Sequence, residues 1–226
     1  VMGEKAKQAP AEVCVGGLDC NTDCLAVAVA SSQGNLLAHK TIWMHDLPDV
    51  QANIAEHLIS QALELALDFL ETQGAKSLVV ERLKFAQDHG SQHTFNRRTT
   101  RFRSTMVNLA MRKALRRGMK VVQVNPAYSS IIGKYKYTDA YGLSVHEAAA
   151  FVLARRGQER RENLPKQIVA QFPHLQAHLL TEALTLPTTD KKRHTYERWA
   201  YKLSHWKGEH PWSLWFIWDQ AARLIS

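Results

Sequence analysis

The chain has 226 residues, enough for one large domain or for one domain plus an appendage. Its formal net charge of +8 favours an anionic partner such as nucleic acid, although many soluble proteins share such a charge. It has no signal-peptide pattern and no apolar run of about 18 residues, so we expect a cytoplasmic protein without a membrane partner. Three cysteines, without a Cys-x-x-Cys pair, indicate a reducing compartment and no zinc site built from cysteine alone.

The first patterned stretch, residues 13–31, predicts two buried strands joined by a polar turn. Its apolar runs are Val13–Leu18 and Leu25–Ala30. Asp19 stands where the first strand ends, and an ionised carboxylate there is costly unless it is solvated, hydrogen-bonded or bound to a cation. Because aspartate is also an ordinary turn residue, this stretch alone leaves a turn role and a functional role open.

The following segments have the spacing of a mixed α/β domain. Leu36–Met44 is a third strand candidate, and residues 46–72 have helical spacing, with Gly74 as a natural stop. Ser77–Glu81 is a short apolar strand that again ends in an acid, and Lys120–Val124 is a further strand. A strand, a helix and a strand in this order imply parallel pairing.

The segment between these last two strands is strongly basic. Polar residues 84–104 predict a mobile loop, and Met106–Leu115 predicts a helix that docks by one apolar face. No acid lies between the first and last of eight basic residues: Arg97, Arg98, Arg101, Arg103, Arg112, Lys113, Arg116 and Arg117. A solvated helix face usually mixes the two signs of charge, so the missing acids favour contacts with a phosphate backbone, with a solvated face as the alternative.

Residues 127–141 form a connection rich in tyrosine and lysine, including Lys134 and Lys136. Its aromatic and basic side chains suit stacking on bases and pairing with phosphates, but the tyrosines equally suit packing against the sheet. Next, Ser144 is an N-cap candidate that places His146 and Glu147 in the first turn of an alanine-rich helix.

The chain divides by composition into three parts. Residues 1–11 predict a flexible end, residues 12–157 a folded domain, and residues 158–226 a tryptophan-rich helical extension packed on that domain. Whether the tryptophans form a core, grip nucleic acid or meet a partner is left open by the sequence.

The order of these elements describes a ribonuclease H-like α/β fold, a mixed sheet flanked by helices with a helical C-terminal extension. In that layout, acids from the first strand, a central strand and the last helix meet at one end of the sheet. Two divalent cations bridged by such acids activate water and stabilise the leaving oxygen of a phosphodiester. Hard oxygen ligands suit Mg²⁺ or Mn²⁺ rather than zinc. Asp19, Glu81 and an acid near Glu147 are placed as this chemistry needs, which makes them the candidate catalytic and metal-binding positions.

At these residues the sequence resembles the RuvC-like nuclease domain of the TnpB transposon-associated family, relatives of type V CRISPR effectors. The matching segments are Gly17–Asp19 with its following strand, Val79–Leu83, Arg117–Ser130 and the alanine-rich helix after Gly142. This resemblance implies a metal-dependent endonuclease that cuts DNA, guided by RNA in its full-length context, with residues 12–157 as the nuclease domain.

Two departures from that family lie in the last motif and in the gap before it. The gap from Ser130 to Leu143 contains no cysteine, so we expect no zinc ribbon. Where the family has an aspartate before paired alanines, this chain has His146 and Glu147; the choice between them depends on the alignment. We favour Glu147 as the third ligand because a carboxylate bridges hard cations, with His146 as the alternative. The usual guide-binding lobe is also missing from the sequence, which suggests a fragment or a minimal relative.

Two other functions compete with the nuclease. One is a non-cleaving nucleic-acid-binding module of the same fold, in which the altered last motif has cost the third metal ligand. The other is an accessory subunit that docks onto a partner protein through its tryptophan-rich tail. Asp19 and Glu81 together favour the nuclease, and the oligomeric state is not indicated by the sequence.

Overall fold

The structure is a computed structural model that describes residues 13–44, 52–82, 94–207 and 213–225. Of helix residues 52–53, 94–102 and 225, only the backbone is described. The expected flexible end, residues 1–11, lies outside these ranges. None of the helices in the described ranges is long and apolar enough to cross a membrane.

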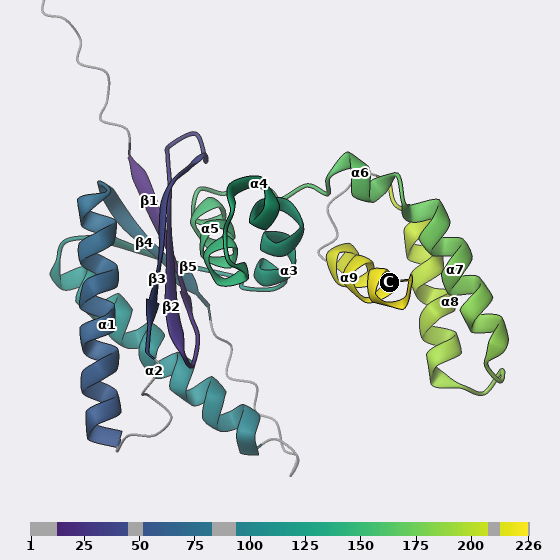
Figure 1. Cartoon of the computed structure of the whole chain (residues 1–226), viewed down its shortest axis with the longest axis horizontal. Coiled ribbons are helices and arrows are strands. Elements are labelled where there is room, and N and C mark those ends of the chain that lie inside the picture. The colour runs from purple at the N-terminus through teal and green to yellow at the C-terminus, as the bar shows by residue number, and fades with distance from the viewer. Residues whose placement is uncertain (1–12, 45–51, 83–93, 208–212, 226) are drawn as a thin grey trace, which may run out of the picture.

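Within the described part of the chain, one mixed sheet has the strand order β3-β2-β1-β4-β5 (Figure 1). β1 (Cys14–Cys20), β2 (Cys24–Ala30) and β3 (Leu36–Trp43) pair antiparallel. β4 (Ala75–Glu81) pairs parallel to β1, and β5 (Lys120–Val124) pairs parallel to β4. This arrangement of strands confirms the predicted mixed α/β fold.

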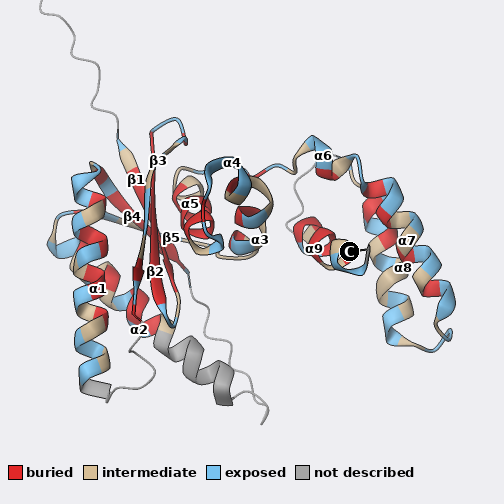
Figure 2. Cartoon of the chain, viewed as in Figure 1, coloured by how far each residue is buried: buried red, intermediate tan, exposed pale blue. Residues whose placement is uncertain are grey.

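Both faces of the sheet are covered by helices, as Figures 1 and 2 show. α1 (Ala52–Thr72) and α2 (Thr94–Arg116) lie on one face, and α5 (Val145–Gly157) lies on the other. The sequence of β2 reflects this burial, because side chains alternate between the faces of a strand. Leu25, Val27 and Val29 face the α1 side, whereas its alanines pack under α5.

Helix α5 approaches β1 closely because the strand carries glycine at the crossing. A Cβ atom at Gly17 would lie 2.0 Å from the carbonyl oxygen of Ala150 and 2.7 Å from the amide nitrogen of Ala154. The helix has small residues at the same place, with Ala148–Ala150 fully buried. Small residues on both elements therefore bring the first turn of α5 over the end of β1.

One sequence expectation about an irregular segment is corrected by the structure. Helix α2 begins at Thr94, so residues 94–104 are helical rather than a loop, while residues 84–93 lie outside the described ranges. No glycine or proline interrupts residues 94–117, and arginine is a good helix former. The connection after β5 is helical as well, forming α3 (Ser129–Gly133), the π-helix η2 (Lys134–Thr138) and α4 (Asp139–Tyr141).

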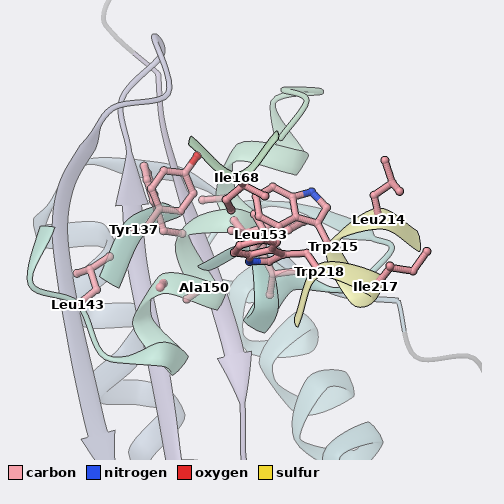
Figure 3. Close-up of a cluster of buried hydrophobic side chains, with 14 of the residues drawn as sticks. Tyr137, Leu143, Ala150, Leu153, Ile168, Leu214, Trp215, Ile217 and Trp218 are labelled. Carbon is pink, nitrogen blue, oxygen red and sulfur yellow. The ribbon is translucent and has the colours of Figure 1, made fainter. Parts of the chain in front are cut away.

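The C-terminal extension consists of helices in its described part. These are α6 (Lys166–Val169), α7 (Phe172–Thr185), α8 (Lys191–Ser204) and α9 (Ser213–Ile225). Helices α7 and α8 lie side by side as a hairpin (Figure 1). Trp215 and Trp218 of α9 belong to the same buried cluster as Leu153 of α5 (Figure 3). At least these two tryptophans therefore serve as core residues.

A buried carboxylate joins the extension to the domain. Glu162 is 2% exposed and accepts hydrogen bonds from Lys136, Tyr137 and Arg155. The indole nitrogen of Trp215 donates to the backbone oxygen of Glu162. Tyr137 also packs edge-on against Phe151, with ring centroids 4.8 Å apart. Tyr137 is thus a packing residue, one of the two roles that the sequence left open for the tyrosines.

Candidate active site

The site begins with two acids at the carboxyl ends of neighbouring parallel strands. Gly17 of β1 pairs with Val79 of β4, and two residues further along each strand come Asp19 and Glu81. Because side chains alternate along a strand, both acids point to the face that carries α5. They are buried, with exposed fractions of 2% for Asp19 and 4% for Glu81. The sheet therefore brings together the two acids that the sequence singled out.

The first turn of α5 separates the roles of His146 and Glu147. The Ser144 hydroxyl accepts from the Glu147 amide at 3.2 Å, and the Ser144 amide donates to Oε2 of Glu147 at 3.0 Å. The other carboxylate oxygen of Glu147 lies 3.0 Å from Nδ1 of His39 on β3. His146 instead lies with its Nδ1 3.3 Å from Oδ2 of Asp19. Of the two alternatives for the third position, His146 is thus the one that contacts an acid of the site.

Arg103 of α2 lies between the two acids. Its Nη2 atom is 3.1 Å from each carboxylate oxygen of Glu81 and 3.9 Å from Oδ1 of Asp19. Its Nε atom donates to the backbone oxygen of Cys20 at 2.9 Å. Since one nitrogen contacts both acids, these carboxylate oxygens lie within about 7 Å of each other. The sequence grouped Arg103 with residues that contact phosphate, whereas here it is the partner of the acids.

The electrostatics of the site reflect two buried carboxyl groups held close together. Burial raises the pKa of Glu81 to about 7, and the neighbouring charge of Asp19 adds to this rise while Arg103 opposes it. The hydrogen bond to Asp19 raises the pKa of His146, which favours the imidazolium form. For Glu147, burial opposes ionisation, but hydrogen bonds from His39 and Ser144 outweigh it and lower the pKa.

Two further neighbours of the site were missed at the sequence level. The Asn21 side-chain amide donates to Oδ2 of Asp19 at 2.9 Å, and its position two residues after Asp19 is a signal that sequence reasoning had available. His39 gave no such signal, because it contacts Glu147 only through the packing of α5 on the sheet.

A divalent cation such as Mg²⁺ needs several hard oxygen ligands arranged around it. Among the described residues, no three His, Cys, Asp or Glu side chains are grouped so that they hold a metal ion. The donor types nevertheless fit Mg²⁺ or Mn²⁺, because Asp19 and Glu81 offer buried hard oxygens within about 7 Å of each other. The difference lies in Arg103, whose guanidinium contacts the oxygens that a cation would use.

The other basic residues that the sequence assigned to nucleic acid are either exposed, outside the described side chains, or close to acids of the chain. Arg112 and Arg116 are exposed. The side chains of Arg97, Arg98 and Arg101 lie outside the described part. Lys113 and Arg117 form ion pairs with acids of α1, namely Glu64, Asp68 and Glu71. Lys136 pairs with Glu162, and Lys134 lies 3.8 Å from a carboxylate oxygen of Asp219.

Comparison with known proteins gives relatives without an assigned activity. No protein-family model matches the chain. It is similar to an uncharacterised protein of Saccharolobus solfataricus, 29% identical over 153 residues, which cover 63% of this chain and 40% of the relative. Two uncharacterised proteins of Aeropyrum pernix are 26% identical over 163 residues, covering 67% of this chain and 44% and 39% of the relatives. The chain thus spans less than half the length of these relatives.

Two solved structures of Thermus thermophilus RuvC are also similar to the chain. One is in complex with a Holliday junction substrate, with a TM-score of 0.45 and 14% identity, covering 63% of this chain and 90% of that one. The other has a TM-score of 0.42 and 16% identity, covering 63% of this chain and 91% of that one.

Proposed function

We propose that the chain is a nuclease domain whose site, formed by Asp19, Glu81 and His146, uses a divalent metal to hydrolyse phosphodiester bonds of nucleic acid. The observation that carries this proposal is the pair of buried acids at the ends of β1 and β4. Aspartate and glutamate are almost never fully buried unless they are paired. The fold holds two such acids close together although this raises the pKa of Glu81. A pair of acids held in this way is what a cation site requires.

Each side chain has a distinct part in this proposal. Asp19 and Glu81 would hold the cation through their oxygens, and His146 orients the Asp19 carboxylate through its hydrogen bond. When bound, the metal supplies an activated water and neutralises charge on the phosphodiester. Glu147 fixes the start of α5 by capping it, which keeps His146 over the end of β1.

The substrate and partners follow from the resemblance of the sequence motifs. We infer that the substrate is DNA, that Mg²⁺ or Mn²⁺ is the metal, and that a guide RNA takes part in a longer, TnpB-like protein. The proposed contacts for the phosphate backbone are Arg97, Arg98 and Arg101 together with the exposed Arg112 and Arg116 of α2.

Cleavage assays on the 226-residue chain test this function. Short single-stranded and double-stranded DNA and single-stranded RNA are incubated with the protein in MgCl₂, MnCl₂ or EDTA. We expect cleavage that requires the metal and is abolished in Asp19→Asn and in Glu81→Gln. His146→Ala should lower the rate by about 10- to 100-fold, the usual cost of losing a group that orients a metal ligand.

Glu147→Gln is the matched variant at the neighbouring position. Glutamine serves a capping box as glutamate does, so we expect most of the activity to remain and stability to fall by less than about 1 kcal/mol, from the lost charge at the helix N-terminus. The reverse result, with Glu147→Gln inactive and His146→Ala active, would assign the third position to Glu147, as the sequence alone favoured. Nucleic-acid binding without cleavage in either metal would reject the nuclease.

One observation favours a non-cleaving binding module as the second candidate. Arg103 neutralises the acids without any metal, and an arrangement of this kind also suits a site that has lost its reaction. The docking subunit has less support, because Trp215 and Trp218 are buried in the chain's own core.

A further inference from the structure

Arg103 makes the contacts that a metal ion would make at this site. Its guanidinium donates to both oxygens of Glu81 and lies 3.9 Å from Asp19. The two acids are 2% and 4% exposed, so water contributes little to their solvation. Buried carboxylates need a positive charge close by, and in this structure Arg103 provides it.

A divalent cation and a guanidinium compete for these oxygens. Both bind through the same carboxylate lone pairs, and the two positive charges repel each other at the distance where both would have to sit. The Arg103 side chain is able to swing from the acids into solvent, because 31% of it is exposed. The backbone oxygen of Cys20 accepts from its Nε atom, and Nη2 is the atom that contacts the acids.

We propose that Arg103 is a built-in counter-ion that lowers the affinity of the Asp19–Glu81 site for divalent metal, and that metal binds by displacing it. The inference rests on the proposed function, because it takes the two acids as metal ligands. It implies that an anion drawing Arg103 away, such as the phosphate backbone of a bound nucleic acid, raises the affinity for metal. By linkage, bound metal then raises the affinity for that anion by the same factor.

The direct test is a Mn²⁺ titration of the 226-residue chain, with free Mn²⁺ measured by electron paramagnetic resonance. Arg103→Gln removes the competing charge, and we expect it to bind Mn²⁺ at least about tenfold more tightly than the unmodified chain. Arg103→Lys keeps the charge and should stay close to the unmodified chain. Arg117→Gln is the matched control, since it removes one positive charge directly after the same helix, at a residue that pairs with acids of α1.

The outcomes separate the inference from the proposed function. Equal Mn²⁺ affinity in Arg103→Gln and the unmodified chain, or an equal gain in Arg117→Gln, would overturn the inference alone. Binding that survives Asp19→Asn, or no Mn²⁺ binding in any variant, would overturn the proposed metal site and with it the inference.

A second measurement covers the case in which Arg103→Gln folds poorly without metal. Removing the guanidinium leaves Glu81 and the Cys20 carbonyl without their donor, so the variant loses stability. The Tm is then measured by thermal unfolding at increasing MnCl₂ concentrations. The Tm of Arg103→Gln should rise more steeply with MnCl₂ than that of the unmodified chain, because a more tightly bound ligand stabilises the folded state more. A rise that is equal or smaller contradicts displacement.

Discussion

The close crossing of α5 over β1 yields a sharp prediction for Gly17→Ala. The new Cβ atom would lie 2.0 Å from the backbone oxygen of Ala150, so α5 must withdraw by about 1.4 Å to reach the 3.4 Å of ordinary van der Waals contact. The clashing atoms are backbone and cannot rotate away. We expect Gly17→Ala to lower the free energy of unfolding by about 3 kcal/mol, the upper part of the usual range for overpacking.

Gly16→Ala is the control for this prediction. The neighbouring glycine faces the other side of the sheet, where the new Cβ would meet the Cδ atoms of Leu70 at 2.7 and 2.9 Å. Those atoms end a flexible side chain that shifts at low cost, so we expect a loss of about 1 kcal/mol. Both substitutions stiffen the unfolded chain alike, and their difference therefore isolates the clash with α5.

Urea unfolding followed by tryptophan fluorescence measures both variants. The chain has six tryptophans, and among those that the structure describes Trp215 and Trp218 are buried in the cluster that includes α5. If Gly17→Ala is no more destabilised than Gly16→Ala, the crossing of α5 over β1 is not as close as described. The contact between His146 and Asp19 would then lose its structural basis.

Two further predictions concern charge. The pKa of Glu81 is raised from 4.5 to about 7, so the folded chain binds this proton more tightly than the unfolded chain. Stability in EDTA should therefore fall as pH rises from about 4.5 to 7 and level off above, and Glu81→Gln should lose part of that fall. An unchanged pH profile of unfolding would assign the fall to other groups, such as His146. For α2, replacing Arg97, Arg98 and Arg101 by alanine should weaken nucleic-acid binding and reduce the log–log salt slope by about 0.7 to 0.9 per lost phosphate contact. A slope equal to that of the unmodified chain would identify these residues as a solvated helix face.

Local patterns in the sequence were sufficient for most of the elements. Apolar runs marked β1, β2 and β4, and the capping pattern at Ser144 marked the start of α5. These local patterns did not predict a helix where the helix lacks a continuous apolar stripe. The first turns of α2 are polar and basic, so the sequence predicts a loop over residues 94–104 although nothing in them breaks a helix.

The same contrast holds within the candidate site. The sequence predicts Asp19 and Glu81 as a pair, because each acid ends an apolar strand and acids of the first and a central strand meet in a ribonuclease H-like layout. The parallel pairing of β1 with β4, which brings the two strand ends to one edge, is seen in the structure. The role of Arg103 is a matter of tertiary structure, since its contacts with Glu81 depend on how α2 crosses the sheet. The choice between His146 and Glu147 likewise depends on the rotation of α5, which its packing on Gly17 sets. Sequence position determines which residues are near a strand end, but the direction of a side chain on a packed helix is decided by the contacts that hold the helix.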